Sequence, residues 1–388
     1  MVRVLQYIGL LQTGGSQSFI LELYRNMDRT KVQFDFIVFS QVNQELAREI
    51  RKLGGKIYKS PQYCGVNHFE YQKWWDSFFH FHPEYQVLHG HVRSVAAIYT
   101  PAAKKYGLTV IVHSHSTSNG TGIRAGLKDL MQLPIRFQAD YFFACSKEAG
   151  EWLFGRKACN SAKYRFVPNS IAVRKFLYQE AARQKVRDEL NLSGKKVIGN
   201  AGRIAEPKNQ VFLIEMMQYI PDDDVRLLIV GDGYLLQDLK RKAVQLGVDG
   251  RVVFTGARND MHRVYQAMDV FVFPSLWEGL PVSLIEAQAG GLRCLVSDRV
   301  TRDVVLTKGI KRLPLEKGTG YWATQVKQAL RFGRKSLDKE DMERLEKFDS
   351  RHVAQELQEF YLCCMKDMHQ MRPGTKQPVF GRRKDSER

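Results

Sequence analysis

The feature that most limits the fold of this chain is a repeated alternation of short apolar runs with longer amphipathic segments. The runs are rich in Val, Ile, Leu and Phe, as is typical of strands buried on both faces. This alternation predicts an α/β fold with parallel sheets and right-handed crossovers. We expect strands at residues 2–8, 33–40, 56–59, 85–89, 109–113 and 141–145, and then at 196–201, 225–230, 252–255, 269–273 and 293–298.

The length and composition of the chain limit its class. With 388 residues it is long enough for two α/β domains with a sizeable core in each. It has no run of eighteen apolar residues and opens on a strand pattern rather than a cleavable signal, so we expect a cytoplasmic protein. Its six cysteines lack zinc-like spacing and are expected to be reduced, with Cys145 and Cys294 as small core residues.

The formal net charge of +18 predicts attraction to anions. Nucleic acid is not expected as a partner, because no helix-turn-helix, zinc-finger or RNA-binding signature accompanies the charge. A solvated basic surface is one interpretation. Peripheral attachment to the anionic inner face of a cell membrane is the other.

Two histidine pairs come at the ends of predicted strands, His89-Gly-His91 and His113-Ser-His115. Residues two apart on a strand share a face, so each pair is able to grip a metal ion. A metal-dependent hydrolase is therefore a rival interpretation, although no carboxylate ligand stands nearby in the sequence. A third is a non-catalytic basic module that only binds surfaces.

Residues 273–286 predict an anion site. They read as the end of a buried strand, a tight loop with Gly279, and a helix that begins near Pro281. We expect Gly279 to adopt backbone angles closed to other residues, and the loop to point free N–H groups at a ligand. Glu278 and Glu286 then face one pocket from different heights. Such a site suits a sugar nucleotide, with hydroxyls for the carboxylates and a diphosphate for the amides.

The string Pro-Ser-x-x-Glu-Gly-Leu-Pro at 274–281, followed by Glu-Ala at 286–287, closely resembles the E-x7-E signature of the retaining glycosyltransferases of family four. That family has the GT-B architecture of two facing Rossmann-like domains. The resemblance implies four parts: an acceptor-side domain at 1–170, a nucleotide-sugar donor domain at 171–347, a helix at 348–370 that crosses back to the first domain, and a basic tail at 371–388, which we expect to be disordered.

The resemblance also implies an activity. The protein would move a sugar from a nucleotide diphosphate donor, a UDP-sugar by preference, to a hydroxyl of a glycan or lipid-linked acceptor, with retention of configuration. Relatives of this kind build capsule or exopolysaccharide. Neither a cofactor nor a metal is expected, because no Asp-x-Asp metal clamp stands at a strand end.

Four residues are implied as catalytic. Arg203 and Lys208, in a Gly-Arg-x(4)-Lys pattern after a buried strand, match the family's diphosphate clamp. Glu278 would hold hydroxyls of the donor sugar. His113 would lie near that sugar, whereas His89, His91 and His115 are expected in loops with no defined role.

The implied donor-binding residues are spread over both halves of the chain. They are Gly14 and Gly15 opposite the donor, Gly202 beside the clamp, Ala257 and Arg258 at the base, Gly279, Leu280 and Pro281 at the diphosphate, Glu286 at the ribose, and Thr301 on the phosphate side. The chain departs from the family pattern at four positions: Gln12 replaces a lysine, Ser170 and Asn209 replace glycines, and Arg293 replaces a proline.

Overall fold

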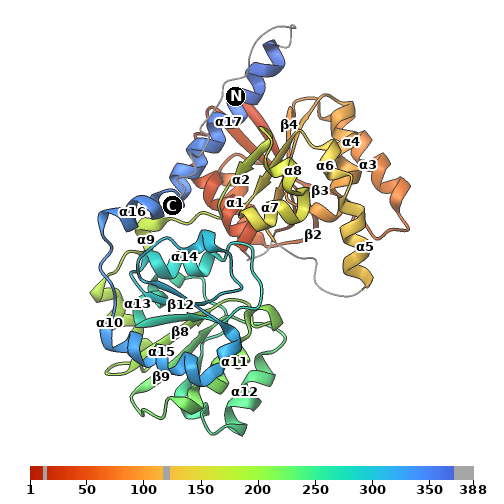
Figure 1. The fold of residues 1–388 in the computed structure, drawn as a ribbon. Coiled ribbons are helices and arrows are strands. Elements are labelled where there is room, and N and C mark those ends of the chain that lie inside the picture. Colours follow the sequence, from red (N-terminus) through yellow and green to blue (C-terminus); the bar gives the residue numbers. More distant parts are fainter. Residues whose placement is uncertain (12–14, 117–122, 371–388) are drawn as a thin grey trace.

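The computed structural model describes residues 1–11, 15–116 and 123–370. Within them the chain forms two parallel sheets, each covered by helices, as Figure 1 shows. Gly14 and the predicted tail at 371–388 lie outside the described residues.

The first sheet has seven strands in the order β3-β2-β1-β4-β5-β6-β7, all in parallel pairs. Six of them lie where the sequence predicts them. The seventh, β7, was missed, because it is a three-residue edge strand that is only partly buried. The strands are β1 (Val2–Leu11), β2 (Val32–Val42), β3 (Ile57–Lys59), β4 (Val87–Gly90), β5 (Thr109–Ser114), β6 (Tyr141–Ala144) and β7 (Tyr164–Phe166).

The second sheet has six strands in the order β10-β9-β8-β11-β12-β13, also parallel throughout. The edge strand β13 was missed because its sequence Ile-Lys-Arg-Leu carries two charges and lacks a continuous apolar run. The strands are β8 (Lys196–Ala201), β9 (Val225–Val230), β10 (Val252–Phe254), β11 (Val270–Phe273), β12 (Arg293–Ser297) and β13 (Ile310–Leu313).

Helices follow most of the strands and cover the two sheets (Figure 1). The helix after β6 begins at Ser146, whose hydroxyl accepts a hydrogen bond from the Ala149 amide at 3.1 Å. The helices of the first sheet are α1 (Gly15–Asn26), α2 (Gln44–Lys52), α3 (His68–Phe81), α4 (Ala96–Lys105), α5 (Ile123–Gln132), α6 (Ile135–Gln138), α7 (Lys147–Phe154) and α8 (Arg156–Cys159). Later come α9 (Val173–Phe176), α10 (Glu180–Glu189), α11 (Gln210–Met216), α12 (Leu236–Gln245), α13 (Met261–Ala267), α14 (Val282–Ala289), α15 (Gly318–Phe332), α16 (Lys339–Glu346) and α17 (Ser350–Gln370).

The last helix, α17, packs against the first sheet rather than the second. It contacts α1, β1 and β2, and its residues Val353, Leu357 and Tyr361 are buried in the core beside those elements. The domain limits remain a prediction; the first sheet ends at Phe166 and the second begins at Lys196. No helix in the described ranges is both long and apolar enough to cross a membrane.

Both sheets reverse their strand order next to their first strand, between β1 and β4 and between β8 and β11. Ligands of open parallel sheets bind beyond the carboxyl ends of the strands at such reversals. The loops with Arg203, Lys208 and Glu278 follow β8 and β11, and the histidine pairs lie at the ends of β4 and β5. The fold therefore places the predicted site residues at its two reversal points.

Candidate active site

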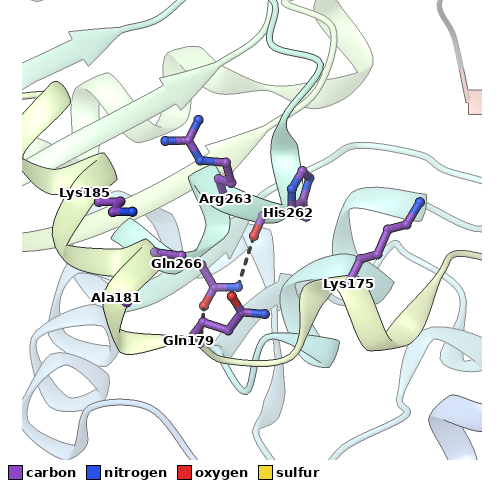
Figure 2. A pocket seen from close by; sticks show the side chains of 8 residues that line it. Lys175, Gln179, Ala181, Lys185, His262, Arg263 and Gln266 are labelled. Carbon is purple, nitrogen blue, oxygen red and sulfur yellow. Dashed lines mark hydrogen bonds between the residues drawn. The ribbon is translucent and has the colours of Figure 1, made fainter.

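Two pockets in the described part of the chain lie away from the predicted site residues. The first, about 310 Å³, lies between α13 and the segment of α9 and α10, with Lys175, Lys185 and Arg263 around it (Figure 2). The second, about 290 Å³, is lined by residues that include Phe166, Arg302 and Phe348. Neither is lined by a residue that the sequence assigned to donor binding.

Lys208 and Glu278 come together in the structure. The Nζ of Lys208 lies 2.6 Å from Oε1 of Glu278, and it also lies over the ring of Phe273, 4.9 Å from its centroid. Both charged side chains are largely buried, with 19% and 16% of their surface exposed. A cation suited to phosphate and a carboxylate suited to sugar hydroxyls thus occupy one site.

The loops that carry these two side chains are tied together by backbone contacts. The Leu276 amide donates to the Pro207 carbonyl at 2.8 Å, and the Asn209 side-chain amide donates to the Pro274 carbonyl at 3.1 Å. Asn209 has φ of 53°, in the left-handed region that asparagine tolerates better than most residues. It can therefore replace the glycine of the family pattern without changing the turn.

Arg203, the other cation of the predicted clamp, is exposed, and its guanidinium has no hydrogen bond or ion pair to the residues that the structure describes. Gly202 before it has φ of 151°. The loop after β9 packs directly on this backbone, because a Cβ on Gly231 would lie 2.0 Å from the Gly202 carbonyl oxygen. The Arg203 loop is therefore held firmly while its side chain stays available to an anion.

Gly279 was expected to adopt backbone angles that other residues cannot adopt, and this expectation was wrong. Gly279 is not among the glycines with positive φ. Glycine is required because a Cβ would lie 2.9 Å from the His115 carbonyl oxygen and 3.4 Å from the Cys145 sulfur. The loop of the second domain therefore sits against the backbone of the first.

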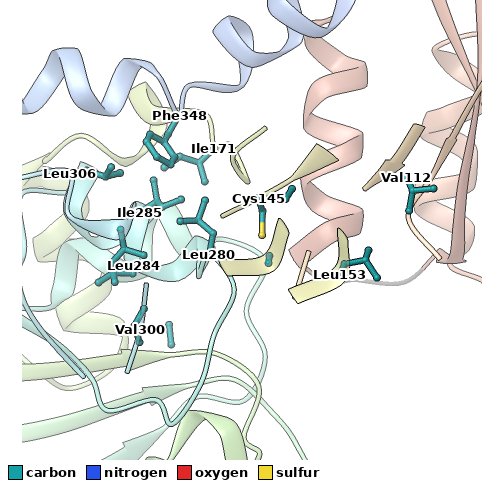
Figure 3. Packing of buried hydrophobic residues seen from close by; sticks show 14 of the residues in the cluster. Val112, Cys145, Leu153, Ile171, Leu280, Leu284, Ile285, Val300, Leu306 and Phe348 are labelled. Carbon is teal, nitrogen blue, oxygen red and sulfur yellow. The ribbon is translucent and has the colours of Figure 1, made fainter. Parts of the chain in front are cut away.

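Leu280 joins the two domains rather than facing solvent. Its side chain is buried in a cluster that runs from Cys145 across to Ile285 and Phe348 (Figure 3). Its carbonyl accepts a hydrogen bond from the Asn169 side chain at 2.9 Å, and its amide hydrogen-bonds the Cys145 thiol. Burying a leucine side chain in this way stabilises the contact by roughly 2 kcal/mol.

The amides that remain for an anion are fewer than expected. The Leu280 amide has the Cys145 thiol as its partner, and Pro281, the N-cap of α14, has no N–H. Among the described residues, Gly279, Val282 and Ser283 are left with backbone N–H groups that no backbone carbonyl accepts. The predicted diphosphate contact therefore falls to these three amides.

Glu286 lies on α14 and accepts a hydrogen bond from the Tyr265 hydroxyl at 2.9 Å. Burial raises the pKa of its carboxyl to about 7, and the hydrogen bond from Tyr265 works in the opposite direction. Near neutral pH this carboxyl therefore exchanges a proton, and only its ionised form offers both oxygens as acceptors to a ribose.

Ala257 and Arg258 follow β10 as predicted. Ala257 is exposed, but the Arg258 guanidinium is held by Asp260 at 2.8 Å and by Glu189 at 2.7 Å. These two carboxylates raise the pKa of Arg258. A base at this position would therefore meet the backbone and Ala257 rather than a free guanidinium.

Thr301 does not have the free hydroxyl that its predicted role requires. Its hydroxyl donates to the Glu148 carboxylate at 2.7 Å, which links the second domain to α7. Beside it the Lys147 amide donates to the Asp303 carboxylate at 3.2 Å. Thr301 therefore serves the contact between the domains.

Of the three histidines expected in loops, His91 lies just after β4 and His115 just after β5, as expected, whereas His89 lies within β4. His89 lies in β4 and His113 in β5, and both are buried. The four rings stack on one face of the sheet, with centroids 4.4 Å apart for His89 and His91 and 4.0 Å apart for His113 and His115. This cluster forms because β4 and β5 are neighbours and residues two apart share a face.

Hydrogen bonds divide the cluster into two rows. In the first row the Tyr361 hydroxyl lies 2.6 Å from His89 Nδ1, and His89 Nε2 lies 3.2 Å from His113 Nδ1. The second row runs from Gln6 Oε1 to His91 Nε2 at 3.0 Å, from His91 Nδ1 to His115 Nε2 at 2.8 Å, and from His115 Nδ1 to Asn169 Oδ1 at 3.1 Å.

Burial keeps these imidazoles neutral near pH 7. It lowers the pKa of His89, His91 and His113 well below its usual range, with the neighbouring imidazoles adding to the effect. Burial also lowers the pKa of His115 to about 4, although the hydrogen bond to Asn169 opposes it. Neutral imidazole is also the form that binds metals.

One group in the described part of the chain is able to hold a metal ion, namely His89, His91 and His113, whose ligand atoms lie within 4.8 Å of one another. The group contains no carboxylate, and His89 and His113 already bond to each other. An ion would have to displace that hydrogen bond.

Sequence reasoning missed the roles of Asn169 and Tyr361. Asn169 bonds both His115 and Leu280. Tyr361 is 272 residues from His89, and nothing in the sequence near either residue points to the other. Only the helical spacing around Tyr361 hinted that it is buried.

Comparison with known proteins follows the same division of the chain. Residues 13–175 match the family model described as Glycosyltransferase Family 4, and residues 195–331 match the model described as Glycosyl transferases group 1. The putative glycosyltransferase EpsF of Bacillus subtilis is 31% identical over 342 residues, which cover 86% of this chain and 88% of that protein. The chain belongs to the family-four glycosyltransferases.

Other family-four relatives and solved structures agree. The UDP-Gal:alpha-D-GlcNAc-diphosphoundecaprenol alpha-1,3-galactosyltransferase of Escherichia coli is 28% identical over 231 residues, 55% of this chain and 58% of that protein. The structure of Anabaena Alr3699/HepE in complex with UDP and glucose superposes with a TM-score of 0.77 at 15% identity, covering 93% of this chain and 99% of that one. WaaG, a glycosyltransferase involved in lipopolysaccharide biosynthesis, gives a TM-score of 0.65 at 16% identity, covering 96% and 100%. The predicted GT-B fold is confirmed, and these matches do not favour the hydrolase or the non-catalytic module.

Proposed function

We propose that this glycosyltransferase moves a sugar from a UDP-sugar to a hydroxyl of a glycan or lipid-linked acceptor, with retention of the anomeric configuration. The observation that carries the proposal is the 2.6 Å contact between Lys208 and Glu278 beside the unpaired Arg203. Cations for a diphosphate and a carboxylate for sugar hydroxyls lie at one strand-order reversal.

Donor binding would exchange partners within this site. The diphosphate replaces Glu278 as the partner of Lys208, and the freed carboxylate accepts hydrogen bonds from the sugar. Departure of the sugar builds negative charge on the diphosphate, and each 1.4 kcal/mol of selective stabilisation of that charge is worth about tenfold in rate. Arg203, Lys208 and the amides of the loop supply that stabilisation.

The reaction is proposed to need no metal ion, because the two cations take the place of a divalent ion at the diphosphate. We propose front-face attack, in which the acceptor oxygen bonds to the anomeric carbon on the side that the diphosphate leaves. The leaving phosphate oxygen takes the proton of the acceptor hydroxyl, so configuration is retained without a covalent enzyme intermediate.

Relatives support the donor and the acceptor class. The name of the Escherichia coli relative carries UDP-galactose and a diphosphoundecaprenol-linked sugar, and the Anabaena neighbour was solved with UDP and glucose. We therefore propose a role in polysaccharide biosynthesis, at the cytoplasmic face of a membrane that holds the lipid-linked acceptor.

An anionic membrane surface is the proposed docking partner. The net charge of +18 supports it, as does an apolar group on the first domain, where Leu130 is 63%, Leu133 43% and Phe137 88% exposed beside the exposed Lys128. We expect the protein to sediment with vesicles that contain phosphatidylglycerol at low salt and to be released at high salt. Equal sedimentation with neutral phosphatidylcholine vesicles would contradict this docking.

The test of the function is a panel of UDP-sugars and GDP-sugars, with binding measured by isothermal titration calorimetry and transfer measured by product release. We expect binding and turnover with at least one UDP-sugar. A protein that ignores every nucleotide sugar would instead be a non-catalytic binding module.

A further inference from the structure

The two histidine rows end differently, although both start from the same strands. The first row ends at His113 Nε2, a buried nitrogen with no hydrogen-bond partner of normal geometry among the described residues. The nearby Val167 carbonyl acts to raise the pKa of His113, although it forms no hydrogen bond of normal geometry with the ring. Buried polar atoms in native proteins are rarely left without a partner, so an orphan of this kind points to a ligand.

The position of His113 is fixed by the sheet. In the pairing of β4 with β5, Gly90 lies opposite Val112, so position 91 is level with position 113. His89 lies opposite Ile111, so its ring is a diagonal neighbour of His113 on the same face, with centroids 5.3 Å apart and planes only 9° from parallel. A change at His89 reaches His113 directly.

The hydrogen bonds of the first row have a direction. Because Gln6 turns its side-chain oxygen to His91 Nε2, its amide nitrogen is the group left to bond the Tyr361 hydroxyl. The phenol oxygen then accepts from Gln6, and the phenol donates its own hydrogen to His89 Nδ1. Neutral His89 carries its hydrogen on Nε2 and donates it to His113 Nδ1. Neutral His113 is left with its hydrogen on Nε2.

The second row cannot work in this way. Each nitrogen of His91 and His115 already faces a polar atom, with side-chain oxygens of Gln6 and Asn169 at the two ends, and two neutral imidazoles hold only two hydrogens for these three contacts. Among the two rows, the first joins a hydroxyl on α17 to a buried nitrogen that has no hydrogen-bond partner among the described residues.

We propose that Tyr361 is a positioning residue, which acts through His89 to hold His113 in the tautomer with hydrogen on Nε2, ready to donate to an oxygen of the donor sugar. The proposal rests on the proposed transferase function. It makes α17 a part of the active-site machinery, although this helix comes last in the described chain.

The experiment compares Tyr361→Phe with the wild type in the full-length protein. The variant keeps the buried ring and loses only the hydroxyl. We expect kcat to fall about tenfold while KM for the UDP-sugar stays within about twofold. The reason is that a wrong tautomer of His113 weakens its hydrogen bond mainly in the transition state and only slightly in the bound donor. Nitrogen-15 spectra of histidine-labelled protein report the tautomer directly, with the His113 signals assigned by comparison with His113→Gln. We expect one Nε2–H tautomer in the wild type and a mixture in Tyr361→Phe.

The matched control is Tyr24→Phe. Tyr24 is also fully buried in the first domain, and its hydroxyl bonds Leu53 and Gln33, away from the histidines. We expect it to lose a comparable amount of thermal stability with unchanged kcat and unchanged His113 signals. Tyr361→Phe with wild-type kcat and a wild-type His113 tautomer would overturn the proposal. If the wild type transfers no sugar, the proposed function fails, and the tautomer spectra still decide the role of Tyr361.

Discussion

The carboxyl edges of the two sheets carry different kinds of side chain: charged groups at the second sheet and neutral imidazoles at the first. Beyond the second sheet lie charged groups with few partners among the described residues, since Arg203 is exposed and Lys208 pairs with Glu278. At the edge of the first sheet lie four neutral imidazoles bonded in rows, with His89 and His113 buried and His91 and His115 partly buried. Charged groups that must meet a ligand's charges have few partners within the protein, whereas groups that must hold one orientation are packed and hydrogen-bonded.

The largest expected effect tests the charged edge. Lys208→Ala or Arg203→Ala should abolish measurable transfer, a loss of about 10²-fold or more in kcat, because charge on the leaving diphosphate is no longer stabilised. The fold should stay intact, since neither side chain belongs to the core. Initial rates and circular dichroism melts check this.

The control for the charged edge is Lys196→Ala. Lys196 lies at the other end of the same strand, where it pairs with Asp224. We expect this variant to keep its rate. Unchanged turnover in Lys208→Ala would remove the clamp from the mechanism.

The next effect tests the contact between the Gly279 loop of the second domain and the His115 backbone of the first. Gly279→Ala should push the loop off the His115 carbonyl, because the new Cβ would lie 2.9 Å from that oxygen. We expect a loss of roughly 1–3 kcal/mol in stability together with a fall in kcat. Thermal melts and rates check both. Gly250→Ala, where a Cβ meets nothing within 4 Å, is the control, and equal behaviour of the two variants would show that the loop has room to spare.

A smaller effect tests Glu286, the partly buried carboxyl on α14. The pKa of Glu286 is raised to about 7, so the folded state binds its proton more tightly than the unfolded chain does. Stability from this group is present at low pH and is lost as pH rises through about 7. At pH 8 Glu286→Gln should therefore be more stable than the wild type by on the order of 1–3 kcal/mol in the free energy of unfolding, which a thermal melt detects as a higher unfolding temperature. This difference should shrink as pH falls.

The same residue predicts a pH dependence of donor binding. Wild-type affinity for UDP, measured by calorimetry, should weaken as pH falls through 7, because the carboxyl gains a proton and loses acceptor capacity. Glu286→Gln should bind more weakly and without that dependence. A pH-dependent affinity that survives in the variant would assign the titration to another group.

The last prediction is that removing metal ions has no effect on the reaction. Treatment with EDTA should leave transfer unchanged, since the proposed clamp uses fixed cations. Activity that is lost with EDTA and restored by zinc would instead make His89, His91 and His113 a working metal centre, because these are the described residues that can gather around an ion.

The sequence predicted the charged edge far better than the histidine edge. Lys208 and Glu278 each stand in a short pattern directly after an apolar strand, so local sequence was enough to place both at the ends of β8 and β11. The same reasoning located β9 at Val225–Val230, whose buried run is unmistakable. Edge strands such as β7 were missed because three partly buried residues carry no such signal.

The histidine rows needed information that local patterns do not contain. The rings of His89 and His113 meet because β4 and β5 pair in one particular register, and Tyr361 reaches them from a helix at the far end of the chain. The role of Gly279 was misread for the same reason, since its neighbours His115 and Cys145 belong to the other domain.

The placement of α17 has a consequence for how the protein is made. A ribosome releases the first domain early, yet Val353, Leu357 and Tyr361, which complete its core, are synthesised hundreds of residues later. Until then the apolar surface of α1, β1 and β2 that α17 covers would be exposed to water and to chaperones. The first domain would thus gain its complete core, and Tyr361 would reach the histidines, only after α17 has been made.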